Sequence, residues 1–218
     1  DADGTACTYT LSGTDAADFS IVSNTGVITF VSSPNYEIPA DNGGNNIYEF
    51  TVTATSNSNT DTQTFTITVT DVNDNSPVIT SNSGGSTASV SVAEGNTAVT
   101  TVTSSDGDSG DGATYSISGT DAADFSIDAN SGVLTFSSTP DYENPADANT
   151  NNEYIVVATV TDDGSNTDTQ TITVTVTDVN DNSPVISSPN SGNAYSANYA
   201  ENGSSSVADV DYTDADGD

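Results

Sequence analysis

The chain contains no lysine, arginine or histidine, against 32 aspartate and glutamate residues, so its formal net charge at pH 7 is −32. Phosphate binding needs basic side chains, which argues against nucleic acid as a partner. The same sign of charge excludes binding to an anionic membrane surface. Because no carboxylate can pair with a basic side chain of the same chain, cations from solution must supply the counter-charge.

The missing residue types also limit catalysis. A Ser-His-Asp triad requires histidine, and covalent chemistry through a Schiff base requires lysine, so both are excluded. Pairs of carboxylates could act as they do in glycosidases. The paired acids of this chain, however, all fall in repeated linker motifs, where metal binding explains them better. We therefore expect that the protein is not an enzyme.

Cysteine and methionine are nearly or wholly absent, with one cysteine and no methionine in 218 residues. Cys7 therefore has no partner for a disulfide within the chain. The lack of methionine indicates a processed product or a part of something longer. The sequence has no signal peptide and no apolar run long enough to span a bilayer, so we expect no direct membrane insertion.

Hydrophobic residues make up only 33% of the chain, and low hydrophobicity with high net charge is typical of disorder. Here, however, the apolar residues alternate with threonine in short runs. In the stretch TQTFTITVT, Phe65, Ile67 and Val69 take one face and threonines take the other. This period of two, with many β-branched residues, predicts half-buried β-strands rather than a disordered chain.

The sequence repeats itself at the length of a domain. The letters SGTDAADFSI begin at Ser12 and again at Ser118, an offset of 106. The nine letters DVNDNSPVI begin at Asp71 and again at Asp178, an offset of 107. One residue, most simply Gly164, has therefore been inserted in the second copy.

Clusters of Gly, Asn, Asp, Ser and Pro separate the β-runs throughout, and no segment shows helical periodicity. About seven short strands in roughly a hundred residues are typical of an immunoglobulin-like Greek-key β-sandwich, so we expect an all-β fold with such sandwiches in an extended tandem row. In the second copy we expect strands near Ser89–Val92, Thr97–Thr103, Thr114–Ile117, Gly132–Phe136, Tyr154–Thr161 and Thr169–Thr177.

The phase of the repeat predicts three parts. Residues 1–75 lack the first strands of a domain, residues 76–182 are a complete domain, and residues 183–218 resemble the first strands of a further one. Two interpretations stay open. The chain is a window from a long tandem array, or residues 183–218 complete residues 1–75 of a neighbouring copy by strand addition, which would make a filament.

The linker motif has the chemistry of a calcium site. Calcium takes six to eight oxygen ligands and tolerates irregular geometry. Asp71, Asn73 and Asn75 alternate along an extended segment and so project oxygens to one side, while Asp74 adds a carboxylate. Asparagine supplies oxygen without further charge, which limits repulsion in the empty site. Pro77 stiffens the exit from the linker.

Several motifs follow one another in the order seen in cadherin repeats, and the chain resembles that family over nearly its whole length. The most specific of them is the linker motif itself, found twice at a domain-length period. The composition, rich in Asn, Asp and Thr, resembles bacterial cadherin-like repeats more than animal ones. The motifs are AEG (Ala93–Gly95), DGDSGDG (Asp106–Gly112), TDAADFSIDANSGVLTF (Thr120–Phe136), PDYENP (Pro140–Pro145), TDDG (Thr161–Gly164) and DVNDNSP (Asp178–Pro184).

The resemblance implies two sets of calcium ligands. The first set would be Asn35, Glu37, Asp71, Asn73, Asp74, Asn75, Asp106, Asp108 and Asp162. The second set would be Glu94, Asp141, Glu143, Asp178, Asn180, Asp181, Asn182, Asp214 and Asp216. The first set departs from the family pattern twice. Asn35 stands where the family has Asp, and the counterpart of Glu94 would lie before the first residue of this sequence.

A single Asp in a turn is usually a solvated loop residue, but here the spacing recurs twice without any cation to relieve the charge. An EF-hand starting at Asp106 would need a bidentate Glu at its twelfth position, which is Ile117. Cys7 aligns with Ala113 of the second copy, so we expect a small strand residue there, with a bond to a partner chain as the alternative.

The function that the resemblance implies is that of an extracellular structural or adhesive rod, secreted or on a bacterial cell surface, whose calcium-filled joints fix the angle between domains. Its partners would be calcium, other copies of itself, and glycans or a cell-surface protein. The alternative is a carbohydrate-binding module, which would need an exposed face lined by Tyr or Asn. A self-assembling filament is the other class of function.

Overall fold

The computed structural model describes residues 6–187, 196–203, 208 and 210–217. These residues are almost entirely β-strands and loops, with two short 3-10 turns, η1 (Ala16–Asp18) and η2 (Ala122–Asp124). The all-β prediction is therefore confirmed. Within the described residues there is no helix of the length and apolar character needed to cross a membrane.

The chain forms two compact units. Unit 1 comprises Asp1–Asn75 together with Asp106–Asp111, and unit 2 comprises Ser76–Ser105 together with Gly112–Asp218. The loop 106–111 leaves β9 and returns to β10, both strands of unit 2, but packs with unit 1.

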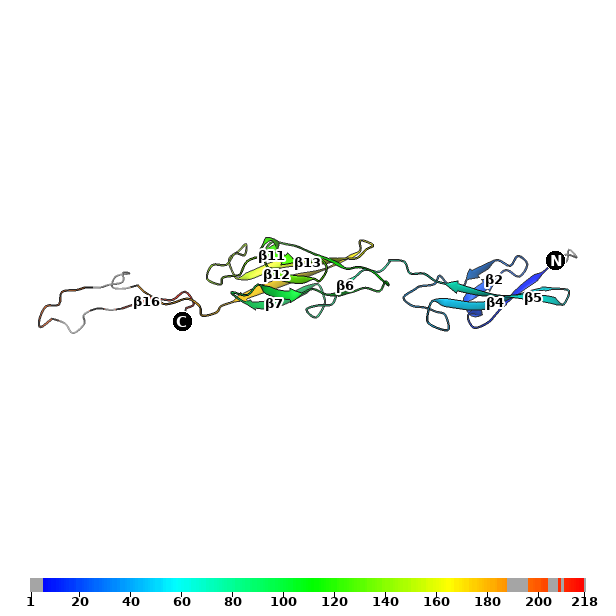
Figure 1. Cartoon of the computed structure of the whole chain (residues 1–218), viewed down its shortest axis with the longest axis horizontal. Helices are drawn as coiled ribbons and strands as arrows, with labels where there is room; N and C mark the ends of the chain where they lie inside the picture. Colours follow the sequence, from blue (N-terminus) through cyan, green and yellow to red (C-terminus); the bar gives the residue numbers. More distant parts are fainter. Residues whose placement is uncertain (1–5, 188–195, 204–207, 209, 218) are drawn as a thin grey trace. The chain divides into compact units, whose positions relative to one another are not determined.

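Unit 1 has two groups of strands (Figure 1). Three strands form an antiparallel sheet in the order β1-β4-β5, and β2 and β3 form a separate antiparallel pair. The strands are β1 (Thr8–Ser12), β2 (Phe19–Ile21), β3 (Ile28–Phe30), β4 (Ile47–Ser56) and β5 (Asn59–Thr68). Asn57 and Ser58 join β4 to β5 with φ of 46° and 74°, the left-handed conformation that tight hairpins require.

Unit 2 has the same plan with more strands. Its sheets have the orders β10-β13-β14-β7 and β11-β12-β8, with separate two-stranded pairs β6-β9 and β15-β16. The β14–β7 pairing is parallel and the others are antiparallel. The strands are β6 (Val78–Ile79), β7 (Thr87–Ala93), β8 (Ala98–Thr101), β9 (Ser104–Ser105), β10 (Thr114–Ser118), β11 (Phe125–Ile127), β12 (Val133–Phe136), β13 (Glu153–Thr161), β14 (Thr167–Thr177), β15 (Val185–Ile186) and β16 (Tyr212–Thr213).

The alternating runs form the core of unit 2. Val156, Ile172 and Val174 are fully buried, and Phe125, Phe136 and Tyr154 pack edge to face or stacked beside them. All six strands expected from the sequence are present, with ends within two residues of the predicted ones. The strands β6, β9 and β11 and the turn η2 were not predicted, because two or three residues are too few to show a period.

Buried aspartates hold the connecting loops in both units. Asp121 is 4% exposed, and its carboxylate accepts the N–H groups of Ala148 and Ile155 at 2.9 and 2.7 Å. Asp15 does the same in unit 1 with Asn42 and Glu49, at 2.8 and 2.7 Å. Buried carboxylates are stable only when hydrogen-bonded in this way. These bonds anchor the ends of the loops that carry the acidic NYE and DYE motifs.

Candidate metal centres

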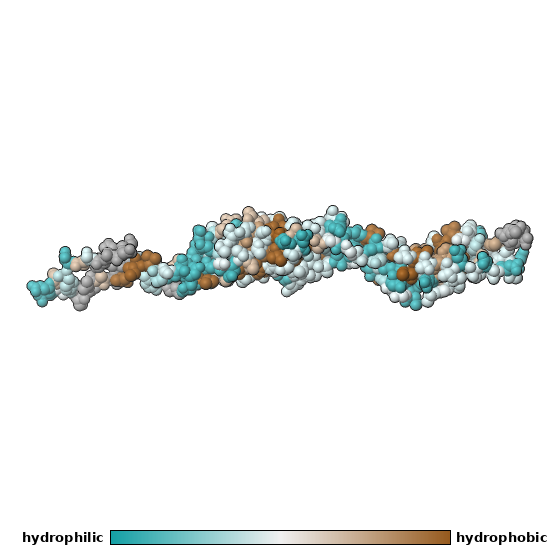
Figure 2. Space-filling model, viewed as in Figure 1, coloured by the Kyte–Doolittle hydropathy of each residue, from teal (hydrophilic) through white to brown (hydrophobic). Residues whose placement is uncertain are grey.

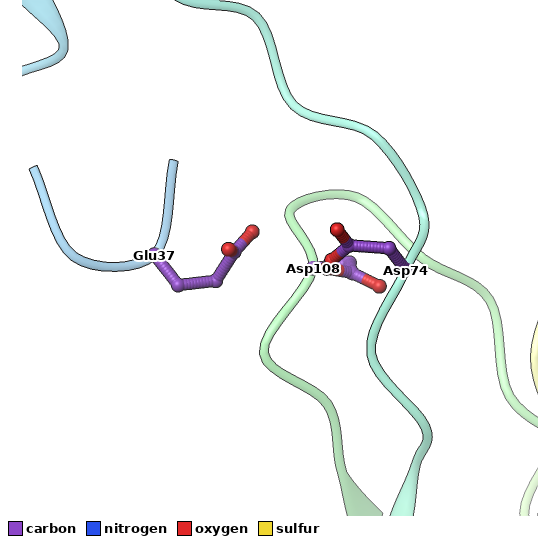
Figure 3. A group of neighbouring side chains, drawn as sticks. All are labelled: Glu37, Asp74 and Asp108. Atoms are coloured by element: carbon purple, nitrogen blue, oxygen red, sulfur yellow. The ribbon is translucent and has the colours of Figure 1, made fainter. Parts of the chain in front are cut away.

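The first acidic site, in unit 1, consists of Glu37, Asp74, Asp106, Asp108 and Asp111. Carboxylate oxygens of Glu37, Asp74 and Asp108 all lie within 4.8 Å of one another. Figure 3 shows these three side chains on three separate chain segments, with the Glu37 carboxylate pointing toward the other two. Asp106, Asp108 and Asp111 form a second group within the same limit, so Asp108 is shared by both groups.

Hydrogen bonds from the linker hold Asp108 in place. The Asn75 backbone N–H donates to Oδ2 of Asp108 at 2.9 Å, and Asn75 Nδ2 donates to Oδ1 at 2.6 Å. The N–H of Asp108 itself donates to Asp106 Oδ1 at 3.1 Å. The hydrogen bond from the Asn75 side chain is the main reason why the pKa of Asp108 lies below its ordinary value, against the opposing effect of burial.

Two further linker residues bind the same loop. The Ser109 N–H donates to Asp71 Oδ2, and Asn73 Nδ2 donates to Asp111 Oδ2 at 2.6 Å. The alternation predicted from the sequence therefore orders the linker: Asn73 and Asn75 give hydrogen bonds to carboxylates, while Asp71 accepts one.

Three carboxylate oxygens of the first acidic site and the adjoining linker are buried without any hydrogen bond. They are Glu37 Oε1, Asp71 Oδ1 and Asp106 Oδ2. A main-chain hydrogen bond lowers the pKa of Glu37, but burial and the neighbouring Asp74 and Asp71 together raise it above its ordinary value. Carboxylate oxygens that converge without hydrogen bonds repel one another, and their burial destabilises the fold unless a cation lies among them. The donor set fits a hard, oxygen-binding cation such as Ca²⁺.

The second acidic site, in unit 2, consists of Glu94, Asp141, Glu143, Asp181 and Asp216. Two groups of three meet the same 4.8 Å limit, Glu94 with Asp141 and Glu143, and Glu143 with Asp181 and Asp216. Glu143 is shared by both groups, and its Oε1 is buried without a hydrogen bond. Glu143 Oε1 is therefore the counterpart in unit 2 of the unpaired Glu37 Oε1 in unit 1.

Glu94 connects three parts of the second acidic site. Its Oε2 accepts the Tyr142 N–H at 2.7 Å and its Oε1 accepts the Val179 N–H at 2.8 Å. The side chain is buried. Glu94 thus fixes both the DYE loop and the start of the second linker while its carboxylate faces Asp141 and Glu143.

The second linker repeats the hydrogen bonds of the first. Asn182 donates to Asp216 from its backbone N–H and from Nδ2, both at 2.8 Å, and the Asp216 N–H donates to Asp214 Oδ1 at 3.2 Å. The Asn182 side chain is again the main cause of a lowered pKa, here that of Asp216. Identical linker sequences therefore give the same local geometry twice.

The pKa values of two acids in the second acidic site are raised. For Glu143 the largest cause is burial, and Glu94, Asp216 and Asp178 add like-charge repulsion. For Asp181 burial again comes first, followed by Glu94, Asp216 and Asp141. The charged form of both carboxylates is therefore less stable than in free solution, and a cation bound among them would favour that form.

The residues expected as ligands fall into two classes. The structure brings Glu37, Asp74, Asp106 and Asp108 together in unit 1, and the five acids of the second acidic site in unit 2. Within the linkers, Asp71, Asn73, Asn75 and Asn182 take part in the hydrogen bonds given above, and Asp214 accepts from Asp216. Asp178 and Asn180 lie in the second linker, outside these carboxylate groups.

Two expected ligands are engaged elsewhere. Both carboxylate oxygens of Asp162 accept hydrogen bonds from Asn166, at 2.7 and 2.8 Å, in the turn between β13 and β14. Asn35 Oδ1 accepts the Ile38 N–H at 3.0 Å. Asp162 lies outside the clustered carboxylates. Asp111 was missed from the sequence, although the third Asp of the DGDSGD stretch was a visible signal for it.

The comparisons with known proteins point to one family. Residues 88–177 match the model of the cadherin domain. Among solved structures, Drosophila N-cadherin EC1-4 is 26% identical with a TM-score of 0.64, over 81% of this chain and 42% of that one. The protocadherin gamma B4 extracellular domain is 27% identical with a TM-score of 0.62, over 82% of this chain and 27% of that one.

The match to human CDH23 EC21-23 covers 98% of this chain and 75% of that chain, with a TM-score of 0.74. Because the two sequences are only 22% identical, this match shows the fold alone. No curated protein matches the chain in sequence. The chain spans less than half of the N-cadherin and protocadherin chains that it resembles. The resemblance drawn from the linker motifs is confirmed, and residues 88–177 form a domain of the cadherin family.

Proposed function

We propose that this chain is part of an extracellular structural or adhesive protein in which calcium, held at the two acidic sites, fixes the segments that join successive repeats. The observation that carries the proposal is the pair of buried, unpaired oxygens, Glu37 Oε1 and Glu143 Oε1. They lie at corresponding positions of the two motif copies, each among carboxylates from other chain segments.

The charge of the chain supports a cation. With 32 acidic residues and no Lys, Arg or His, no side chain of this protein can neutralise either site. The oxygens of Asp, Glu and Asn are the hard ligands that calcium prefers. Calcium, when bound, would supply the counter-charge and satisfy the unpaired oxygens. Glu37 and Asp74 would bind it in unit 1, and Glu94, Glu143 and Asp181 in unit 2.

The connectivity of the chain gives the proposed mechanical role. The loop 106–111 lies between β9 and β10 of unit 2, but its Asp108 carboxylate clusters with Glu37 and Asp74 of unit 1. Asn73 and Asn75 of the linker already donate to Asp111 and Asp108. Closing this cluster around an ion would tie the linker, the loop and Glu37 into one segment. Without the ion, repulsion among the same carboxylates would loosen it.

The remaining parts of the proposal come from the resemblance. The resemblance suggests the division into repeats at residues 1–75, 76–182 and 183–218. It also suggests a location outside the cell and a bacterial source. One of the similar structures is by name an extracellular domain, and it belongs to a family of adhesive proteins. Adhesion through copies of the same chain is the corresponding proposal for the partners.

A carbohydrate-binding function is less well supported. Each unit has a groove next to its NYE or DYE motif, of about 310 Å³ beside Tyr48 and about 360 Å³ beside Tyr154. Both tyrosines are 1% exposed. A sugar ring needs an open aromatic face on which to stack, and these rings present none. Tyr142, which is 38% exposed, lies outside the lining of either groove.

The test is a calorimetric calcium titration of the whole chain and of two single variants, Glu37→Gln and Glu143→Gln. Each variant should remove or weaken binding at its own site and leave the other intact. The matched controls are Glu49→Gln on β4 and Glu153→Gln on β13, because both glutamates are exposed and lie outside the clusters. No calcium binding by the unmodified chain, or equal losses in the controls, would overturn the proposal.

A further inference from the structure

The groove of unit 2 lies between η2, the end of β12 and the loop that carries the DYE motif. Its volume is about 360 Å³, near the lower end of the range for small-ligand pockets. Asp124 of η2, Phe136 of β12 and Tyr154 of β13 all line it. The groove therefore combines a carboxylate with an apolar wall, and it has room for one extended side chain.

Asp124 differs from the two buried aspartates behind it. Asp121 accepts two backbone N–H groups, as described above, and Asp147 accepts those of Asn151 and Asn152 at 3.0 and 3.1 Å. The Asp124 side chain is half-buried. Within the described residues, nothing donates a hydrogen bond to its carboxylate. The groove thus contains a carboxylate that the protein itself leaves without a donor.

The surroundings of Asp124 favour a positive charge in the groove. Burial is the largest cause of the raised pKa of Asp124, and repulsion from Asp121 and Asp147 adds to it. A cation beside the carboxylate would stabilise its charged form. Because the chain has no Lys, Arg or His, such a cation has to come from another molecule.

The apolar wall fits the stem of a basic side chain. Phe136 and Tyr154 are 4% and 1% exposed, and their rings pack edge to face with centroids 5.1 Å apart. The Tyr154 hydroxyl accepts the Ala146 N–H at 3.0 Å, which fixes the ring. Lysine and arginine bury their alkyl stems along such surfaces while the charged end stays among polar groups. An alkyl stem does not need the open ring face that a sugar requires.

The rim of the groove is polar. Ser137, Ser138, Thr139 and Asn144 line it and are exposed. Their hydroxyl and amide groups can both donate and accept hydrogen bonds, so they can bind the peptide groups on either side of an inserted side chain. The rim therefore fits a segment of polypeptide better than a simple amine.

The same groove occurs in unit 1, where it has a volume of about 310 Å³. Asp18, Phe30 and Tyr48 line it at an offset of 106 from Asp124, Phe136 and Tyr154. The backbones of Asp18 and Asp124 are held identically. Each N–H donates at 3.0 Å to the carbonyl three residues earlier, and each carbonyl accepts an N–H at 2.8 Å. The position of the carboxylate is thus part of the repeated fold.

The two grooves differ at the rim. Val31 and Ile38, which are 64% and 74% exposed, stand in unit 1 where Ser137 and Asn144 stand in unit 2. We therefore expect the groove of unit 1 to favour a basic side chain with apolar neighbours, and the groove of unit 2 to favour one with polar neighbours.

The charge of the whole chain determines which kind of partner fits. With 32 acidic and no basic residues, the chain attracts basic protein surfaces and repels acidic ones. A second copy cannot supply the cation. In Figure 2 the hydrophobic surface of unit 2, in brown, forms small patches among white and teal surface. The partner therefore has to combine positive charge with a small apolar part.

We propose that the groove of unit 2 binds a lysine or arginine side chain of a different protein. Its cationic group would donate to the Asp124 carboxylate, and its stem would lie against Phe136 and Tyr154. The groove of unit 1 would bind a second side chain in the same way, at Asp18. Each unit then offers one docking point for a basic partner, and neither depends on the proposed calcium function.

Nuclear magnetic resonance of the whole chain in calcium, titrated with capped lysine and capped arginine, tests the proposal. At about 0.15 M NaCl the Debye length is about 8 Å, so general attraction to the acidic surface is largely screened. The amide signals of Asp124, Ser137 and Ser138 should shift saturably. Capped norleucine, which lacks the ammonium group, should bind about tenfold more weakly or not at all.

Three results of this titration would overturn the inference. They are no saturable shift at the groove with either basic probe, shifts confined to the two acidic sites, and binding of butylammonium as tight as that of capped lysine. The last result would assign the groove to free amines rather than to a protein side chain.

Asp124→Asn provides the matched variant. It should weaken binding at the groove of unit 2 by about tenfold, because a charge-assisted hydrogen bond is lost, and leave the groove of unit 1 unchanged. Since the Asp124 carboxylate accepts no hydrogen bond among the described residues, the melting temperature should not fall. Glu153→Gln is the control, because it removes one exposed charge of unit 2 outside the groove. Equal weakening in both variants would refute the role of Asp124.

Discussion

At the scale of single residues, the two acidic sites depend on glutamates that are unfavourable in the absence of a cation. Glu37 and Glu143 each have one buried oxygen without a hydrogen bond, and the pKa of each is raised. Their neighbours Asp108 and Asp216 are instead stabilised by the linker asparagines, and their pKa values are lowered. Each site therefore combines a carboxylate whose charged form is stabilised by hydrogen bonds with one whose charged form is destabilised by its surroundings.

Glu143→Gln should have opposite effects with and without calcium. In chelator the substitution removes a charge whose pKa burial and repulsion have raised, so the melting temperature should rise. In calcium it removes a ligand shared by both groups of the second acidic site, so affinity should fall about tenfold or more. Thermal unfolding in both conditions is the measurement. A lower melting temperature in chelator would show that the ionised Glu143 carboxylate does not destabilise the folded chain.

Asp128 gives a pH dependence that is independent of the acidic sites. Its Oδ1 accepts the N–H groups of Asn130 and Ser131 and the Ser131 hydroxyl. The bond from the Ser131 N–H is the largest cause of the lowered pKa of Asp128. A depressed pKa means that its contribution is complete above the ordinary pKa of about 3.9 and is lost as the pH falls through the folded value.

Asp128→Ala should therefore lower the melting temperature in chelator at pH 6. The difference from the unmodified chain should shrink as the pH falls below the ordinary pKa of about 3.9 and Asp128 takes up a proton. Thermal unfolding followed across this range by circular dichroism measures the difference. If the difference in melting temperature is independent of pH, the hydrogen bonds to the ionised Asp128 carboxylate are not the cause of the destabilisation.

At the scale of elements, the long strands could be predicted and the site loops only in part. The alternation in β13 and β14 is long enough to fix both strand and buried face. β6 and β9 are two residues each, and pairing across the chain rather than local pattern defines them. Asp111 lies among the clustered carboxylates and Asp162 lies outside them, because backbone turns that the sequence does not show set the directions of their side chains.

The buried aspartates are another feature that the sequence did not reveal. Asp121 and Asp15 are buried, and each receives two backbone N–H groups from distant residues. Such long-range bonds need the complete fold, which periodicity alone does not supply.

The difference between β5 and β14 predicts different costs for equivalent truncations. Val174→Ala should destabilise unit 2 by about 2 kcal/mol, because the side chain is fully buried. Ile67→Ala, at the corresponding position of unit 1, should cost about 1 kcal/mol or less in dilute chelated protein, because Ile67 is half-buried. Urea unfolding of each variant, followed by circular dichroism, gives the two values. Equal losses of stability would mean that Ile67 is buried as deeply as Val174.

At the scale of the whole molecule, a charge of −32 without any basic side chain destabilises the folded state through self-repulsion. Repulsion among exposed carboxylates is screened by salt, whereas the clustered carboxylates need an ion among them. In chelator, raising NaCl from about 0.05 to 0.5 M should increase the melting temperature. The increase should stay below that produced by millimolar calcium. If NaCl alone reproduces the calcium effect, the effect is general screening rather than site binding.

The central claim is that calcium at the two acidic sites fixes the segments between repeats, and small-angle X-ray scattering of the whole chain tests it most directly. The account predicts a narrow distribution of dimensions in calcium and a broader one in chelator, at a concentration where sedimentation shows monomers. The Glu37→Gln variant should scatter in calcium more like the chelated protein, and Glu49→Gln should behave like the unmodified chain. Identical scattering with and without calcium would contradict the account.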